Sequence, residues 1–496
     1  MAAILTLDLG STQLKLMVLS ENAEVLYLDS EKYPTYAEDG GFLEQKPEEW
    51  IEALQRGMRK LGQRMDARSI DAVSFSGHMS GVVLVDKQGE VLRPCVMLSD
   101  SRSQQECVEL SETVGELVRR YTGNPVINAF SLPKLLWIKR HEPQLWRQTD
   151  VWLAPKDYLR YWITGEKATE YTDAYNSLCV DRISRTWCEA VIDATGLEKS
   201  KFPKMLSPDA QAGAVTAKAA QALGLRAGTP VYAGGADMAC GALGMGLFNV
   251  GESALTLGTC ATFLAPVQTA DDRFFGQVTY HLHAVPGMFY ALGSHFNGGL
   301  AVNWFSSLMN EKGELDYETV SALAAQAARV PVGSQGVMTI PFLVGSGSPY
   351  FNAADRLNIL GASAATGRGQ LFRSLLEGIT MNLRQTKEIF DTLSPGRLKN
   401  VYLGGGGCRV APWPQMIADI FDMEIQETVH ADASTVGAAI LGGMGAGIFT
   451  DARKTALDML NVSRRLTPDA AQAGRYAELY PQYLNLYRLL SGRSNV

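Results

Sequence analysis

The sequence predicts an α/β protein of two lobes, on the evidence of its length, two similar hairpins far apart in the chain, and amphipathic helices between them. At 496 residues the chain is too long for one compact core. The first hairpin opens the chain and the second spans 251–268. Each has an apolar strand, a turn with Gly beside a hydroxyl side chain, and a second strand. We expect one lobe over 1–249 and the other over 250–496.

The individual elements follow from local patterns. "ILTLDLG", "STQLKLMVLS" and "VLYLDSEKYP" predict three consecutive strands, and "GESALTLGTCATFLAPVQ" predicts a strand ending at Leu257, a turn and a further strand. One-sided apolar stripes predict helices over 47–65 and 369–393. Gly378 lies inside the second helix, where glycine is unfavourable, so we expect close packing there. Tyrosines at 476, 480, 483 and 487 predict a docked tail helix.

Composition excludes several classes of protein. The formal net charge is −7, and no basic run suited to nucleic acid or an anionic membrane occurs. No apolar stretch approaches the roughly 18 residues needed to span a bilayer, and the first residues do not resemble a signal peptide. The seven cysteines are scattered without a C-x-x-C pair, which argues against disulfides and zinc. We therefore expect a cytoplasmic protein.

Common nucleotide-binding motifs are missing from the sequence. There is no P-loop, no G-x-G-x-x-G after the first strand, and no protein-kinase signature. The turns of the two hairpins remain as groups that could bind phosphate. Asp8, expected in the first turn, could hold Mg²⁺ through water, because hard cations prefer carboxylate oxygens. An Asx turn is the alternative use of this aspartate.

The segment "YLGGGGCRVAPWPQMIADIFDM" carries the most specific local pattern. A strand delivers four glycines, at 404–407, and a helix begins near Pro412. Glycines allow a flat ring or a ribose to lie against the backbone, and the following helix N-terminus favours anionic or polar groups. A tight strand-to-helix turn is the alternative, although it would need fewer glycines.

Polar groups suited to a hydroxylated ligand cluster in 74–102. A buried strand leads to the turn "SGHMSG", and Asp100 and Arg102 follow a later apolar run. Two polar clusters at strand ends predict a cleft for such a ligand. His281 and His283 share one face of a probable strand, but with no third ligand we expect no metal site there.

Asp237 is the one carboxylate in "VYAGGADMACGALGMG". It is suited to be the N-cap of the next helix. A helix N-terminus would also keep it ionised and ready to accept a proton from a hydroxyl. The small residues that follow make a poor helix, and we expect them to leave room for the lobes and a ligand to approach.

Together these segments resemble the FGGY family of carbohydrate kinases. The resemblance rests on five motifs in order: "DLGSTQLK", "FSLPKLLWIKRHEP", "GGADMACGALG", "EGITMNLR", and "GGGGCRVAPWPQMIAD" with "STVGAAILGGMGAG". Within the family, 76–102 is most similar to xylulose kinases, but this chain departs from them at His78-Met79-Ser80 and at Leu98. Because of these departures, the resemblance does not determine which sugar is the substrate.

The resemblance implies a two-lobed actin-like ATPase (ribonuclease H-like) fold with a central interlobe cleft, and ATP-dependent phosphorylation of a sugar hydroxyl. The substrate would be a ketopentose such as xylulose, or a related ketose or polyol. The implied catalytic residues are Asp237 as general base and Asp8 with Mg²⁺. The implied ATP contacts are Ser11, Thr12, Lys15, Gly258, Thr259, Gly405 and Gly406. The implied sugar contacts are His78, Met79, Ser80, Asp100 and Arg102.

Two alternatives keep the fold without phosphoryl transfer. One is a catalytically silent sensor that binds nucleotide and sugar, and the other is a chaperone-like ATPase. The expected partners are ATP and a small sugar, without nucleic acid or membrane, and a homodimer is among the assemblies left open.

Overall fold

The computed structural model describes residues 2–310, 313–429 and 432–492, and the chain divides into two compact units. The first unit comprises Met1–Phe248, Tyr280–Phe289 and Ala431–Leu460. The second comprises Asn249–Thr279, Tyr290–His430 and Asn461–Val496. The chain thus leaves the first unit after residue 248 and returns to it twice. The expected division at residue 250 does not include these two returns.

The first unit is built on a sheet with strand order β12-β13-β6-β1-β2-β3, and β14 also pairs with β6. The three predicted N-terminal strands are confirmed as β1 (Ala3–Leu9), β2 (Gln13–Ser20) and β3 (Val25–Lys32), which form an antiparallel meander. The remaining strands are β6 (Ala72–Gly77), β12 (Gln211–Ala214), β13 (Pro230–Tyr232) and β14 (Gly235–Ala236). Strands β6 and β14 run parallel to β1 and β6, respectively.

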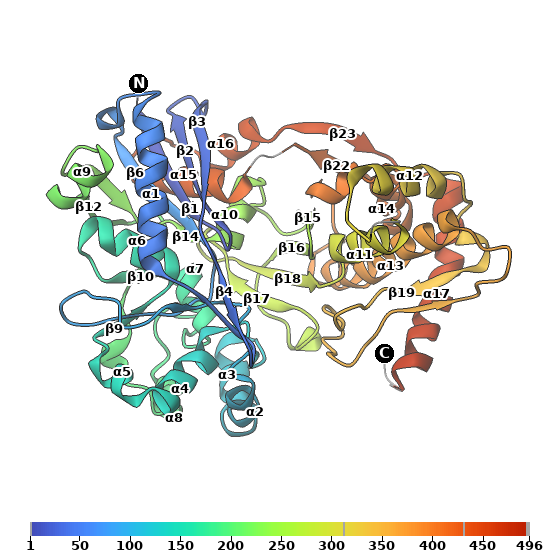
Figure 1. Ribbon diagram of the computed structural model, residues 1–496, viewed down its shortest axis with the longest axis horizontal. Coiled ribbons are helices and arrows are strands. Elements are labelled where there is room, and N and C mark those ends of the chain that lie inside the picture. Colours follow the sequence, from blue (N-terminus) through green and yellow to red (C-terminus); the bar gives the residue numbers. More distant parts are fainter. Residues whose placement is uncertain (1, 311–312, 430–431, 493–496) are drawn as a thin grey trace. The chain divides into compact units, whose positions relative to one another are not determined.

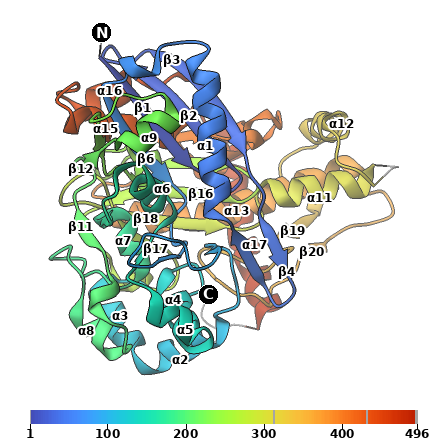
Figure 2. The ribbon, with the colours of Figure 1, turned by 60° about the vertical axis from the view of Figure 1, so that its left-hand side comes forward.

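Alternation along β1 directs its side chains to two different helices. Leu5, Leu7 and Leu9 join one apolar core together with residues of α1 (Pro47–Gly62). Ile4 joins another core with residues of α15 (Ala433–Gly445). The sheet is therefore covered by α1 on one face and α15 on the other, and Figure 2 shows α1 lying along β2 and β3. The period of two places Asp8 on the same face as Ile4, toward α15.

Other elements of the first unit surround this sheet (Figure 1). The further helices are α2 (Gln104–Thr113), α3 (Gly115–Thr122), α4 (Ser131–His141), α5 (Pro143–Gln148), α6 (Pro155–Thr164), α7 (Tyr171–Ala174), α8 (Glu189–Ala194), α9 (Ala217–Leu223), α10 (Asp237–Gly244) and α16 (Ala452–Met459). The short strands are β4 (Tyr36–Glu38), β5 (Phe42–Gln45), β7 (Val83–Val85), β8 (Cys95–Val96), β9 (Val151–Leu153), β10 (Ala168–Glu170) and β11 (Lys204–Leu206).

In the second unit the sheet runs in the order β18-β16-β15-β21-β22-β23. The predicted second hairpin is confirmed as antiparallel β15 (Ala254–Leu257) and β16 (Ala261–Val267). The other strands are β18 (Phe289–His295), β21 (Val401–Gly404), β22 (Ile425–Thr428) and β23 (Val462–Leu466), with β19 (Met338–Ile340) and β20 (Asn358–Leu360) as a separate pair. β21 is parallel to β15, so both strands end at the same edge.

The helices of the second unit include α11 (Gly299–Met309), α12 (Tyr317–Ala328), α13 (Arg368–Leu393), α14 (Trp413–Phe421) and α17 (Ala470–Ser491). α13 confirms the predicted long helix. A Cβ on its Gly378 would lie 2.1 Å from the Thr339 carbonyl oxygen, which is the close packing expected there. The predicted tail helix is confirmed as α17, whose four tyrosines are buried and anchor it to the unit.

Candidate functional site

Three polar residues lie at neighbouring strand ends in the first unit. β6 pairs in parallel with β1 on one side and β14 on the other, with Gly77 opposite both Leu9 and Ala236. Asp8 lies near the end of β1, His78 directly follows β6, and Asp237 directly follows β14. The carboxyl ends of parallel strands are where α/β sheets bind ligands. The fold therefore places these three side chains at one edge.

Asp8 lies inside β1, opposite Lys15 of β2, and not in the turn, so its expected turn position is wrong and the Asx-turn alternative does not apply. Its side chain is buried, and Oδ2 accepts a hydrogen bond from Ser434 Oγ at 2.8 Å. Oδ1 has no hydrogen-bond partner among the described residues. A buried carboxylate oxygen without a donor is costly, which suits it to a cation or a bound ligand.

Asp237 is the first residue of α10, and Ala236 is the N-cap, so the predicted N-cap position is wrong by one residue. Its Oδ1 accepts a hydrogen bond from the Met238 N–H at 2.8 Å. Burial and the neighbouring charge of Asp8 raise the pKa of Asp237 to about 7, against the lowering effects of the Met238 bond and Lys15. Burial outweighs the helix N-terminus, so the expectation that this terminus keeps the carboxyl ionised is wrong. The carboxyl gains and loses its proton near neutral pH.

Lys15 and Asp432 form an ion pair beside Asp8. The Lys15 ammonium contacts Asp432 closely and lies 3.8 Å from Asp8 Oδ2. Burial lowers the pKa of Lys15, but the hydrogen bond to Asp432 and the nearby carboxylates outweigh it, and the pKa is raised. Lys15 is thus charged and held among three carboxylates, counting Asp237.

The α15 segment is the main site feature that the sequence did not place. We expected 434–447 in the adenosine region of the second lobe, but α15 packs in the first unit and brings Asp432 and Ser434 to Lys15 and Asp8. Sequence reasoning missed both residues. The one sequence feature pointing to them is a polar pair at the start of a glycine-rich helix.

The small residues of α10 serve helix packing. A Cβ on Gly244 would lie 1.9 Å from the Ala433 carbonyl oxygen, and one on Gly437 would lie 1.8 Å from the Cys240 carbonyl oxygen. The backbones of α10 and α15 therefore touch. Our expectation that these small residues provide clearance for a ligand is wrong, because α15 occupies that space.

Ser11 and Thr12 form the turn between β1 and β2, and both are exposed. The Ser11 carbonyl accepts a hydrogen bond from Gln45 Nε2 at 2.7 Å, and Tyr33 donates to the Gly10 carbonyl. These contacts hold the turn from its carbonyl side and leave both side chains exposed.

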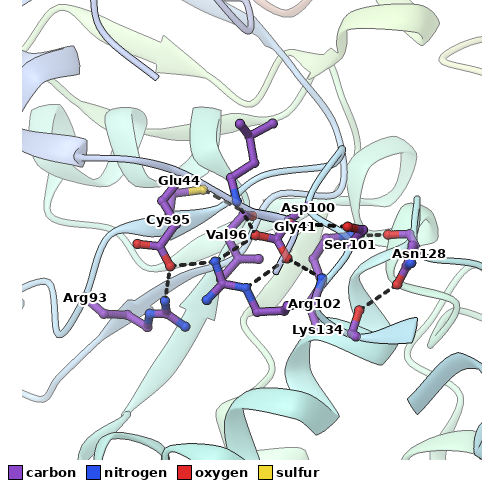
Figure 3. Close-up of polar contacts among 12 residues, drawn as sticks. Gly41, Glu44, Arg93, Cys95, Val96, Asp100, Ser101, Arg102, Asn128 and Lys134 are labelled. Atoms are coloured by element: carbon purple, nitrogen blue, oxygen red, sulfur yellow. Dashed lines mark hydrogen bonds and ion pairs between the residues drawn. The ribbon is translucent and has the colours of Figure 1, made fainter. Parts of the chain in front are cut away.

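Asp100 and Arg102 form a buried pair in the first unit (Figure 3). Arg102 donates to Asp100 through Nε at 2.8 Å and Nη2 at 2.7 Å, and to Glu44 at 2.6 Å. Its guanidinium lies 3.9 Å from the Phe42 ring centroid and 5.0 Å from that of Trp137. Nη1 has no hydrogen-bond partner within the described part of the chain. Asp100 thus orients Arg102, whose Nη1 keeps its N–H groups for a ligand oxygen.

His78, Met79 and Ser80 form a buried turn after β6. The His78 backbone N–H donates to the Leu9 carbonyl at 2.8 Å, which ties this turn to the end of β1. Burial lowers the pKa of His78 to about 4, so the ring is neutral at pH 7. Both of its ring nitrogens, and Ser80 Oγ, lack partners in the described ranges. These groups can bind hydroxyls of a polar ligand.

In the second unit, Gly258 and Thr259 form the hairpin turn between β15 and β16. Their carbonyls accept hydrogen bonds from the N–H groups of Gly299 and Leu300 at 2.7 and 2.9 Å. Because Gly299 begins α11, the turn is fixed to a helix N-terminus. A Cβ on Gly299 would lie 2.7 Å from the Gly258 oxygen. The Thr259 side chain is left exposed.

The predicted strand–glycine–helix segment is confirmed as β21, a short 3₁₀ turn and α14. Gly405 has φ +97°, and its Cβ would lie 2.6 Å from the Leu257 carbonyl oxygen. A Cβ on Gly407 would lie 2.6 Å from the Leu257 side chain, whereas one on Gly406 would meet nothing within 4 Å. The fold thus requires Gly405 and Gly407, and Gly406 alone leaves open space for a ligand.

The carboxylate of Asp8 in the first unit suits a magnesium ion that takes few of its ligands from the protein. No group of three His, Cys, Asp or Glu side chains arranged for a metal occurs in residues 2–310, 313–429 and 432–492. Mg²⁺ is often bound by one or two carboxylates together with water and substrate phosphates. The unpartnered Oδ1 of Asp8 is a carboxylate oxygen of that kind.

Comparison with known proteins identifies the family. The model of the FGGY family of carbohydrate kinases, N-terminal domain, matches residues 3–244, and that of its C-terminal domain matches 253–446. A xylulose kinase from Bacillus subtilis (strain 168) is 31% identical over 489 residues, covering 98% of this chain and 97% of the relative. The chain belongs to the FGGY family of carbohydrate kinases. This confirms the predicted family and shows that the FGGY chain is a sugar kinase.

Solved structures support the same fold. The crystal structure of a xylulose kinase from Rhodospirillum rubrum matches this FGGY chain with a TM-score of 0.92, at 27% identity and 99% coverage of each chain. A Plasmodium falciparum glycerol kinase with ADP matches with a TM-score of 0.86 at 19% identity, covering 98% of each chain, which shows the fold alone. The predicted two-lobed α/β fold class is confirmed. Within the described residues, no helix is long and apolar enough to cross a membrane.

Proposed function

We propose that this FGGY kinase transfers the γ-phosphoryl group of ATP to a hydroxyl of a ketopentose such as xylulose, or of a related ketose or polyol. The relatives named xylulose kinases support the ketopentose. A gluconokinase from Bacillus subtilis (strain 168) is 27% identical over 99% of this chain and 96% of the relative, so we include other sugars and gluconate among the candidate substrates. The turn at His78 also departs from the xylulose kinase pattern.

The placement of Asp8 near the end of β1 and of Asp237 directly after β14, the two strands that flank β6, carries the proposal. Asp237 accepts the proton of the attacking hydroxyl as its oxygen bonds to the γ-phosphorus. The bond from that phosphorus to the β–γ bridging oxygen breaks, and ADP leaves with the electron pair. A pKa of about 7 suits Asp237 to this exchange near neutral pH.

Asp8 would hold Mg²⁺ through Oδ1, and the ion, when bound, neutralises charge on phosphoryl oxygens. Ser11, Thr12 and Thr259 would donate hydrogen bonds to phosphate, and Gly258 would let it approach the backbone. Lys15 is a weaker phosphate contact, since Asp432 holds its ammonium. Gly406 provides the open surface against which adenosine would lie, next to Gly405.

The sugar contacts would come from two buried groups of the first unit. Arg102 offers Nη1, held in place by Asp100, and His78 offers a neutral ring with two unpartnered nitrogens. Met79 supplies an apolar wall, and Ser80 a hydroxyl, in the same turn. A ligand rich in hydroxyls would satisfy these groups without a net charge.

A screen of ADP release tests the proposal. The protein is incubated with ATP and Mg²⁺ and one of a set of pentuloses, hexuloses, polyols or gluconate. We expect sugar-dependent ADP release, strongest with xylulose or a close ketose. Release with none of these compounds, while ATP still binds in calorimetry, would favour the catalytically silent sensor instead. Release that needs no sugar would favour a chaperone-like ATPase.

A further inference from the structure

Five ionisable side chains are buried together in the first unit, outside the proposed contacts. They come from α6 and from the segment formed by β10 and α7: Lys156, Asp157, Arg160, Glu170 and Asp173. The Lys156 ammonium lies 2.7 Å from Asp157, 3.2 Å from Glu170 and 3.4 Å from Asp173. Burying charges is costly even when they are paired, so a buried ionic cluster is weak evidence of stabilisation. In some proteins such a cluster fixes one specific conformation instead.

Two hydrogen bonds connect this cluster to the backbone that leads into Asp237. Arg160 Nη1 donates to the Ala233 carbonyl at 3.0 Å and to Asp157 at 2.7 Å. Thr172 Oγ1 accepts from the Ala236 N–H at 3.0 Å and donates to Glu170 at 2.9 Å. The two contacts lie on either side of Gly234 and Gly235. They therefore hold both ends of the segment 233–236, which ends in β14 directly before Asp237.

The backbone of this segment is also held by the pairing of β14 with β6 and by the Gly234 N–H, which donates to the Pro208 carbonyl at 2.9 Å. Gly234 has φ +72°, and its Cβ would lie 1.9 Å from the Phe75 carbonyl oxygen, so the close approach requires glycine. Two successive glycines leave the backbone flexible. Asp237 directly follows Ala236, so its orientation depends on the contacts that hold residues 233–236. Arg160 and Thr172 supply side-chain contacts at the two ends of this segment.

We propose that Arg160 and Thr172 are positioning residues for phosphoryl transfer, which set the direction of Asp237 by binding the backbone at Ala233 and Ala236. This inference rests on the proposed role of Asp237 as general base. The buried cluster holds the two residues in turn: Asp157 fixes Arg160, and Glu170 fixes Thr172. Small errors in the placement of a reacting group lower rates steeply, so loosening the segment 233–236 should lower kcat.

The test uses Thr172→Val, which keeps side-chain volume and removes the hydroxyl, with Thr172→Ser as the conservative variant. Thr122→Val is the matched control. Thr122 is also fully buried, and its hydroxyl likewise donates one hydrogen bond, to the Val118 carbonyl, and accepts one, from the Asn124 N–H. None of these contacts involves residues 233–237. Each variant is measured for thermal unfolding, and for kcat and KM with ATP and the active sugar.

We expect Thr172→Val to lower kcat by a factor on the order of 10 to 10² while both KM values change less than about threefold. Thr172→Ser should restore most of kcat. Thr122→Val should lose comparable stability and keep its kcat. If Thr172→Val and Thr122→Val have equal kcat, or if Thr172→Ser gives no recovery, the positioning role is overturned.

A double-variant cycle separates this inference from the proposed function. Because Thr172 acts through Asp237, adding Thr172→Val to Asp237→Asn should lower the residual rate no further. A further loss equal to that in the wild-type background would overturn the inference, even with Asp237 as the base. If Asp237→Asn alone retained near wild-type turnover, the proposed function would fail instead.

Discussion

The pH dependence of turnover follows from the environment of Asp237. Burial and the charge of Asp8 raise its pKa to about 7, far above that of an exposed aspartate. At pH 6 about a tenth of the carboxyl groups are ionised, and at pH 8 about nine tenths. Because only the ionised form accepts a proton, the rate should rise about tenfold over these two units. A carboxyl with an ordinary pKa would give a flat profile over the same range.

The assay is ADP release with both substrates well below saturation, so that the rate reports the free protein. ATP also ionises near this range, and a comparison between proteins cancels its contribution. Lys15 lowers the pKa of Asp237, so Lys15→Met should move the acidic limb to higher pH. Lys60→Met is the control, because Lys60 pairs with Asp29 and Glu31 of β3 instead.

Two results would show that Asp237 is not the group that titrates. One is a rate that stays level from pH 5.5 to 8 after correction for ATP. The other is an acidic limb of the pH–rate profile that has the same midpoint in the wild type and in Lys15→Met, because the neighbouring ammonium would then have no effect on the group that titrates. A shift in Lys60→Met of the same size would also contradict the assignment to Asp237.

Three further predictions follow from the same residues. Because the pKa of Asp237 is raised to about 7, protonation of this carboxyl stabilises the folded protein at low pH, and that stabilisation is lost as pH rises through about 7. Asp237→Asn should therefore melt at a higher temperature than the wild type at pH 8, with a smaller difference at pH 5. Equal melting temperatures at both pH values would contradict this. Gly405→Ala places a Cβ 2.6 Å from the Leu257 oxygen and should lower the melting temperature, whereas Gly406→Ala meets open space and should leave stability unchanged while raising KM for ATP; calorimetric and kinetic measurements that show the reverse order would rule this out. Asp8→Asn removes the unpartnered anionic oxygen and should raise the Mg²⁺ concentration needed for half-maximal rate by about tenfold or more; an unchanged titration would exclude Asp8 as the ligand.

Local patterns were sufficient to predict the elements that depend on nearby residues. The strand–turn–strand pattern predicted the β1–β3 meander, and the apolar stripe predicted α13, with the close packing at Gly378. The glycine run at 404–407 was predicted as a strand-to-helix segment, and it is one. Which of those glycines the fold needs was not predictable, because the answer depends on Leu257, far away in the sequence.

The rest of the site depends on contacts that no local pattern reports. Ser434 reaches Asp8 across 426 residues of sequence, and Asp432 reaches Lys15 across 417. α15 was therefore assigned to the wrong part of the protein. The same contact explains why the small residues of α10 were misinterpreted, since their partner was unknown. The pKa of Asp237 likewise depends on burial and on Asp8, which are properties of the fold.

Phosphorus NMR of a reaction with ATP, Mg²⁺ and the sugar from the screen follows the transfer of the phosphoryl group to the sugar itself. We expect a sugar monophosphate resonance that grows in step with ADP, and a rate lowered by a factor on the order of 10² to 10⁴ in Asp237→Asn while ATP binding is kept. ADP accompanied only by inorganic phosphate, or a sugar phosphate formed equally fast by Asp237→Asn, would contradict the proposed function.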